Sequence, residues 1–155
     1  MKIFILTLTF HACFFMGFSQ DLSTPAATVK SFIQAYQSWN DEAFLLKKGT
    51  APEDLESVNE KIEAGYAAFI QQFCIRDFNA LSYSYGSQSA HRIEVEKIVK
   101  EMVEESIAIL STESGTKDQY DFAQYQYHLQ KVGDQWRINK LLWWDDYDEQ
   151  WWEIL

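Results

Sequence analysis

The sequence predicts an α+β fold in which two long N-terminal helices cover one face of a mostly antiparallel sheet. Two observations lead to this prediction. Apolar residues recur every three to four positions over residues 24–75, and apolar and polar residues alternate in the later part of the chain. Short turn sequences join the later segments, which favours antiparallel pairing, and a sheet with one apolar face needs the helices to cover it.

The first nineteen residues have the layout of a secretory signal peptide. Lys2 precedes an apolar run from Ile3 to Phe18, which only a few polar residues interrupt. The small residues Gly17 and Ser19 then place a cleavage site ahead of Gln20. We therefore expect an exported protein, either periplasmic or secreted.

Two alternatives to a cleaved signal remain open. A membrane anchor is one, although the apolar run is short for a membrane span and no basic cluster follows it. A lipid-anchored form through Cys13 is the other, but residues 10–12 fit a lipoprotein cleavage box badly. With cleavage, the mature chain is one domain over residues 20–155, without a membrane span and with Cys74 as its only cysteine. Because Cys74 lies between apolar neighbours, we expect a buried, unreactive thiol.

The first helix is predicted to begin at Thr24-Pro25, where threonine suits the N-cap and proline the first helical position. Gly49 is a plausible end of this helix. One apolar stripe at three- and four-residue steps runs along it. The stripe comprises Val29, Phe32, Ile33, Tyr36, Trp39, Ala43 and Phe44.

A second helix is predicted to begin near Thr50-Ala51-Pro52. Glu53 and Asp54 would occupy its first turn, where the helix dipole favours acidic side chains. Its apolar stripe comprises Leu55, Val58, Ile62, Tyr66, Phe69, Ile70 and Phe73. The two helices would therefore form a hairpin over roughly residues 24–75.

The sheet is predicted from segments with strand-like patterns. Residues 79–91 suit a short strand and a loop, and residues 92–103 are ambiguous between helix and strand, with strand favoured. Residues 106–113 are apolar and β-branched, and residues 114–118 have turn chemistry. Over residues 120–131 one face is apolar and the other carries glutamines and a histidine. The two faces comprise Ala123, Tyr125, Tyr127 and Leu129 against Gln124, Gln126, His128 and Gln130.

The last predicted strand follows a hairpin turn at Gly133-Asp134. Four of its apolar residues are expected to share one face, with Lys140 as an exception in the pattern. They are Trp136, Ile138, Leu142 and Trp144.

The closing hairpin and the first helix resemble a known superfamily. The hairpin reads YQYHLQKVGDQWRINKL from Tyr125 to Leu141, and the helix reads TPAATVKSFIQAYQSWNDEAF from Thr24 to Phe44. Both resemble members of the nuclear transport factor 2-like superfamily. The resemblance implies a cystatin-like cone, in which the helices pack on a curved sheet.

Within that superfamily the chain looks most like a bacterial immunity-protein branch. The stretch from Ile70 to Val99, a helix end followed by a tyrosine-rich connector, adds to this likeness. The resemblance implies a protein without enzymatic residues or cofactors that binds and neutralises a cognate polymorphic toxin. The export signal departs from many members and would place the toxin's site of action outside the cytoplasm.

The charge balance is strongly acidic. The chain has 13 basic and 23 acidic residues, a formal net charge of −10, and 16% aromatic residues. Nucleic-acid binding requires clustered basic side chains that neutralise phosphates, so the composition disfavours it. A basic protein partner, or simply a soluble protein, is consistent with this balance.

The C-terminal segment reads WWDDYDEQWWEIL, and the superfamily resemblance assigns it no position. Aromatic anchors surrounded by charge are typical of a binding hot spot, and the acids would attract a basic toxin. The candidate partner-binding residues are Trp143, Trp144, Asp145, Asp146, Tyr147, Trp151 and Trp152. Alternatively, the four tryptophans cap the core and the acids are solvated. The step from Tyr147 to Trp151 would allow one short helix.

Two other functions remain open. One is a small-molecule-binding or isomerase- or cyclase-like enzyme of the same fold, with candidates Tyr83, Tyr85, Asp121 and His128. Its cone would need a deep apolar pocket, and a cone filled by aromatic side chains would argue against it. Those side chains are Phe32, Tyr36, Tyr125 and Trp136. The other is an exported accessory domain that dimerises through its sheet. The histidines lack the spacing of a metal site.

Overall fold

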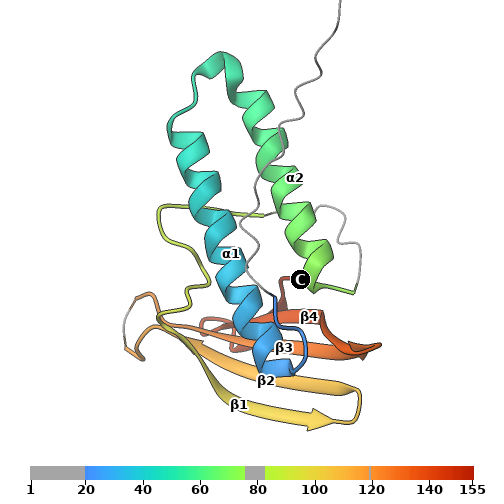
Figure 1. The fold of residues 1–155 in the computed structure, drawn as a ribbon. Coiled ribbons are helices and arrows are strands. Elements are labelled where there is room, and N and C mark those ends of the chain that lie inside the picture. The colour runs from blue at the N-terminus through green and yellow to red at the C-terminus, as the bar shows by residue number, and fades with distance from the viewer. Residues whose placement is uncertain (1–19, 76–82, 119) are drawn as a thin grey trace, which may run out of the picture.

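A pair of antiparallel helices stands on one face of a five-stranded antiparallel sheet (Figure 1). This computed structural model describes residues 20–75, 83–118 and 120–155. The predicted α+β class is therefore confirmed, and the curved sheet with its helical cover matches the expected cone. The predicted signal peptide lies outside the described residues.

Helix α1 spans Pro25–Lys48, as the capping residues predict. The side chain of Thr24 accepts a hydrogen bond from the backbone N–H of Ala27 at 3.1 Å, which satisfies one of the unpaired donors at the helix start. Gly49 follows the last turn as the C-cap.

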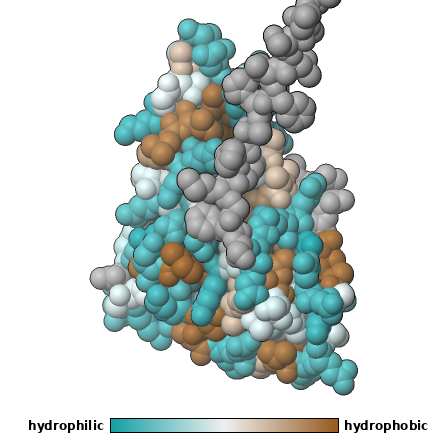
Figure 2. All heavy atoms as spheres, in the orientation of Figure 1, coloured by the Kyte–Doolittle hydropathy of each residue, from teal (hydrophilic) through white to brown (hydrophobic). Residues whose placement is uncertain are grey.

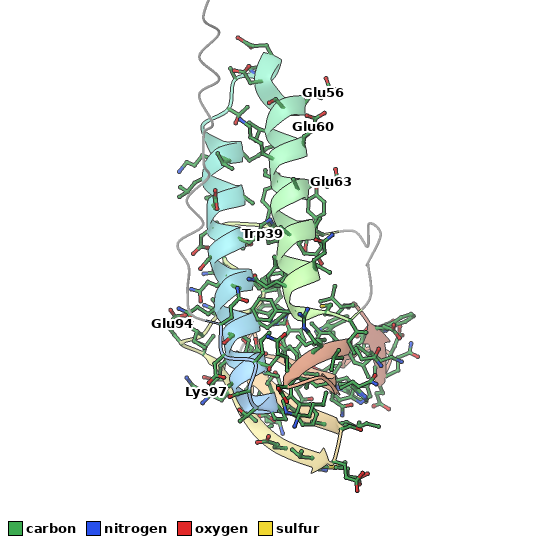
Figure 3. All side chains as sticks on the ribbon, turned by 45° about the vertical axis from the view of Figure 1, so that its right-hand side comes forward. Trp39, Glu56, Glu60, Glu63, Glu94 and Lys97 are labelled. Carbon is green, nitrogen blue, oxygen red and sulfur yellow. The ribbon has the colours of Figure 1, made fainter. Side chains whose placement is uncertain are left out.

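A single 3-10 turn, η1 (Pro52–Asp54), leads into helix α2 (Leu55–Phe73). Trp39 lies between the two helices, and its indole N–H donates to the carbonyl of Ile62 at 3.1 Å (Figure 3). Glu56, Glu60 and Glu63 of α2 point away from this contact (Figure 3). The helical hairpin extends beyond the sheet, so only its lower part covers the strands (Figure 1).

The strands follow one another in space in the order of the sequence, each antiparallel to the next. They are β1 (Glu96–Glu104), β2 (Ile107–Ser114), β3 (Ala123–Val132), β4 (Gln135–Asp145) and β5 (Gln150–Glu153). The predicted two-residue turn at Gly133-Asp134 joins β3 to β4, and Gly133 has a φ of 60°, which glycine adopts without a steric cost.

Three local predictions differ from the structure. The strand favoured over residues 92–103 begins only at Glu96, because residues 93–95 form a turn. Residues 83–91 contain no strand, and the start of that predicted strand lies outside the described residues. The short C-terminal helix is also wrong, because β5 pairs with β4 there.

The predicted face of β4 is wrong in its second half because of a β-bulge. Ile138 pairs with Leu129 and Lys140 pairs with His128, so Asn139 is the extra residue. The bulge reverses the alternation, and the inner face therefore continues through Leu141 and Trp143. Leu142 and Trp144 lie on the outer face, together with Lys140, which explains why this lysine interrupted the sequence pattern.

The core lies between the inner face of the sheet and the lower half of the helices. Phe32 and Phe73 from the helices and Tyr127, Leu129 and Ile138 from the sheet are all at most 1% exposed. The side chains of β3 alternate between the two faces of the sheet as predicted, with Tyr125, Tyr127 and Leu129 facing the core. The first half of β4 has no strand beside it on the β5 side.

Two other segments pair with that half of β4. The N–H of Trp136 donates to the carbonyl of Leu22 at 2.8 Å, and the N–H of Ile75 donates to the carbonyl of Ile138 at 3.0 Å. Both interactions satisfy backbone groups that a free edge would leave to solvent.

Hydrophilic residues cover most of the surface in the view of Figure 2, with apolar side chains gathered near the far end of the helical hairpin and over the sheet. Leu45 and Leu46, at that end of α1, are 67% and 38% exposed. Over the described ranges, no helix combines the length and apolarity that a membrane crossing requires.

Candidate functional site

The seven candidate partner-binding residues all lie on the β4–β5 hairpin, but on two faces of it. Trp144 and Trp151 are directly opposite each other on the outer face, with ring centroids 5.3 Å apart. The indole N–H of Trp144 donates to Oδ1 of Asp146 at 2.7 Å. These contacts fix an aromatic pair beside an acid at the edge of the sheet.

The other two tryptophans lie on the inner face. Trp143 pairs with Tyr125 on one side and with Trp152 on the other. Trp143 and Trp152 are 36% and 47% exposed, and Trp151 is 36% exposed. The tryptophans therefore do not form a buried cap on the core, and each offers part of its ring to solvent.

The turn between β4 and β5 carries most of the acids. Asp145 accepts a hydrogen bond from the N–H of Tyr147 at 2.9 Å, which stabilises the turn. Tyr147 at its tip is 92% exposed. Asp146, Asp148 and Glu149 are exposed as well, so the hairpin end combines an aromatic side chain with concentrated negative charge.

One acid of the segment has a basic partner. Oε2 of Glu153 lies 3.0 Å from Nζ of Lys140 on the outer face of the sheet. Both side chains are more than a third exposed, so the pair contributes little to stability.

The four aromatic side chains expected inside a filled cone are all buried. Phe32, Tyr36, Tyr125 and Trp136 are between 0% and 9% exposed. A cavity of about 250 Å³ remains beside the inner face of the hairpin. Its walls include Tyr36, Tyr83, His91, Tyr125, Trp143 and Ile154.

Behind this cavity lies a buried polar network that sequence reasoning missed. Nδ1 of His91 lies 2.8 Å from Oε2 of Glu96, and both side chains are almost completely buried. The hydroxyls of Tyr127 and Thr112 donate to Oε1 of Glu96 at 2.8 and 2.7 Å. The network joins β1, β2, β3 and the connector before β1.

The network satisfies the carboxylate of Glu96 with three donors, which offsets the cost of removing a charge from water. Burial is the main cause that raises the pKa of Tyr127 well above its usual value, and the nearby Glu96 adds to it. Tyr127 therefore stays protonated and keeps its O–H available as a donor. The aromatic rings of Phe32, Tyr36 and Tyr125 surround His91 with centroids 4.5–5.7 Å away.

Of the side chains proposed from the sequence for an enzymatic role, only Tyr83 and Tyr85 lie together, with ring centroids 6.4 Å apart, and Tyr83 also lines the cavity. Tyr83 and Tyr85 pack around Trp39, with ring centroids 5.8 and 6.1 Å from it. Asp121 pairs with Arg92 at 2.9 Å near the surface.

His128, the last of these candidates, and the thiol of Cys74 are not among the residues that line the cavity. His128 lies on the outer face, as its place among the glutamines predicted. Cys74 is 4% exposed, as expected, and burial raises the pKa of its thiol to about 12. Across the part of the chain that the structure describes, no three His, Cys, Asp or Glu side chains are grouped to hold a metal ion.

Comparison with known proteins connects this fold to one family. A family model described as NTF2 fold immunity protein matches residues 24–154. The matched range contains both helices and all five strands. No curated protein and no solved structure matches the chain.

Proposed function

Because the chain belongs to the family of NTF2-fold immunity proteins, we propose that it binds a cognate bacterial toxin and neutralises it by steric blocking. The observation that carries this proposal is the family match over residues 24–154, which spans the whole described fold except its first few residues and its last. Binding of this kind requires a complementary surface rather than catalytic groups.

The β4–β5 hairpin is the surface that we assign to the toxin. Its tryptophans are each partly packed and partly exposed, so they can bury further area on a partner without a large loss of side-chain freedom. The hairpin also fixes the rings before the partner arrives, through the cross-strand contact of Trp144 with Trp151 and the hydrogen bond from Trp144 to Asp146.

The acids of the hairpin would select a basic partner. Four acidic side chains, Asp146, Asp148, Glu149 and Glu153, are exposed there, and Lys140 pairs with only the last of them. Long-range attraction of this type speeds association more than it tightens the final complex. A toxin whose substrate groove is basic would therefore be approached and covered by this end of the molecule.

Export is a separate part of the proposal, and it rests on residues 1–19 alone. A toxin neutralised by an exported protein acts in the periplasm or outside the cell. Expression of the full chain in a Gram-negative host, followed by fractionation and mass spectrometry, tests this point. We expect a mature chain that begins at Gln20 in the periplasmic fraction, and an intact chain in the cytoplasm would contradict export.

Survival of cells that express a candidate cognate toxin, sought among the genes next to this one, tests the function. Co-expression of the wild-type chain should restore growth, and Trp151→Ala together with Trp152→Ala should weaken that protection. Tyr120→Ala is the control, because Tyr120 is a fully exposed aromatic residue outside the hairpin. If the wild-type chain does not protect against the toxin, the immunity function is wrong. If the hairpin variant protects as well as the control, the assigned surface is wrong.

A further inference from the structure

The cavity beside the β4–β5 hairpin is continuous with the surface assigned to the toxin. Trp143 and Ile154 contribute to its wall, and Trp152 is directly opposite Trp143 on the same face of the sheet. A partner that covers the inner face of the hairpin would therefore lie over the opening. The cavity has a volume of about 250 Å³, enough for one extended side chain.

Aromatic rings and hydroxyls dominate the wall. Tyr36, Tyr66, Tyr83 and Tyr125 all line it, and Trp143 completes the ring of aromatic side chains. The faces of such rings carry partial negative charge and attract ammonium and guanidinium groups. The hydroxyl of Tyr36 already donates to the carbonyl of Ser84 at 3.2 Å, which leaves its lone pairs for another donor.

His91 supplies a polar ring atom, Nε2, to the cavity that it lines. Its Nδ1 faces the carboxylate of Glu96, so in the neutral ring Nδ1 carries the hydrogen and Nε2 presents a lone pair. Nε2 has no hydrogen-bond partner among the described residues. Among the described residues, the side-chain atoms that are both fully buried and without a partner are Oγ of Ser89 and Nε2 of His128. Nε2 of His91 is not one of them. Because it has no partner either, it must be accessible from the cavity that His91 lines.

Among the described residues, the charge beside the cavity is negative. Glu96 lies directly behind His91, its side chain is fully buried, and it accepts hydrogen bonds from neutral hydroxyl donors. Among the described residues that line the cavity, none is a lysine or an arginine. A cation in the cavity would therefore meet the buried carboxylate, the aromatic faces and the Nε2 acceptor together, whereas an anion would meet the same groups unfavourably.

From this geometry we propose that the cavity is an anchor pocket for one lysine or arginine side chain of the toxin, with Nε2 of His91 as its acceptor. The inference rests on the proposed function for the identity of the partner, but the chemistry of the pocket can be tested without the toxin. It narrows the expected basic partner to one that projects a basic side chain at the centre of its contact surface.

The test is an NMR titration of the full chain with N-acetyl-L-argininamide, followed through the ¹⁵N signals of the histidine rings and tryptophan indoles. N-acetyl-L-glutaminamide and N-acetyl-L-glutamate amide serve as neutral and acidic probes. We expect saturable, millimolar binding of the basic probe that shifts His91 Nε2 and Trp143, and at least about tenfold weaker binding of the other two.

Variants separate the pocket from general attraction to acids. His91→Phe and, as a second variant that spares the buried network, Trp143→Ala should each weaken binding of the basic probe about tenfold, whereas Tyr120→Ala should not change it. Equal binding of the neutral or acidic probe, or shifts confined to the exposed acids, would overturn the proposal. If the basic probe binds as expected but the chain fails to protect against the toxin, the pocket stands and the immunity function does not.

Discussion

Nδ1 of His91 and Oε2 of Glu96 lie 2.8 Å apart, and the two side chains are 3% and 0% exposed. Breaking a buried pair of this kind leaves an uncompensated polar group in the interior, and the cost is typically about 3–5 kcal/mol. The pair is therefore a structural element of the cone as well as the back wall of its cavity.

We predict that Glu96→Ala lowers the free energy of unfolding by about 3 kcal/mol or more, because His91, Tyr127 and Thr112 all lose their acceptor. Urea unfolding followed by circular dichroism measures the change. Glu104→Ala is the control, since Glu104 is exposed at the other end of β1. Equal stability of the two variants would show that the network does not hold the fold.

Alkaline pH should destabilise the protein. Burial is the main cause that raises the pKa of Tyr66, Tyr125 and Tyr127 above the usual value of 10.0. The unfolded chain ionises its tyrosines near pH 10 while the folded chain keeps these three neutral, so the free energy of unfolding falls as the pH rises above about 10. At neutral pH the effect is absent.

Absorbance at 295 nm and circular dichroism, recorded together from pH 8 to pH 13, check this expectation. A late step in tyrosine ionisation should coincide with loss of helical signal. Complete ionisation by pH 11 with an unchanged dichroism spectrum would contradict it.

The register of β4 beyond the bulge should determine which of its residues face the core. Inserting one alanine between Lys140 and Leu141 moves Leu141 and Trp143 to the outer face, and we expect a loss of at least about 3 kcal/mol in unfolding free energy. Deleting Asn139 removes only the extra residue of the bulge and keeps Ile138 and Lys140 opposite their partners, so we expect a smaller loss, as urea unfolding would measure. An insertion variant as stable as the deletion variant would mean that the register of this strand is not fixed.

Cys74 should be unreactive in the native protein. Its thiol is buried and has a raised pKa of about 12, so little thiolate exists at pH 8. In a Cys13→Ser chain, a disulfide reagent should label Cys74 rapidly in urea and only slowly in buffer. Fast labelling in buffer would contradict the burial of this side chain.

The parts of the fold that depend on local sequence were predictable. Thr24 and Gly49 define α1 because capping satisfies backbone groups within a few residues of each end. Gly133 defines the β3–β4 turn for a similar local reason. The inner face of β3 followed from strict alternation, since nothing interrupts that strand.

The parts that depend on neighbouring elements were not predictable. Tyr147 and Trp151 fit a helical step, but the adjacent edge of β4 offers hydrogen bonds that a four-residue strand can use. The bulge at Asn139 leaves no sequence signal other than Lys140 out of place. Glu96 and His91 meet in three dimensions through hydroxyls contributed by other strands, and no spacing in the chain encodes that meeting.

For the candidate site, one part of the sequence-based prediction was correct and another was wrong. The sequence correctly singled out the C-terminal segment as unusual, because its tryptophans and acids stand together without a base. It suggested one continuous surface, whereas pairing in a hairpin places Trp144 and Trp151 on one face and Trp143 and Trp152 on the other. On the inner face, Trp143 also lines a cavity together with His91, and no pattern in the sequence indicated this cavity.

Isothermal titration calorimetry of the purified toxin with the purified protein measures whether the inner face of the β4–β5 hairpin binds the toxin. We expect saturable binding to the wild-type chain, a dissociation constant that is at least about a hundredfold larger for Trp143→Ala with Trp152→Ala, and an unchanged constant for Tyr120→Ala. Absence of binding to the wild-type chain would show that the protein does not neutralise this toxin by binding it, and equal constants for all three proteins would show that the hairpin is not the binding surface.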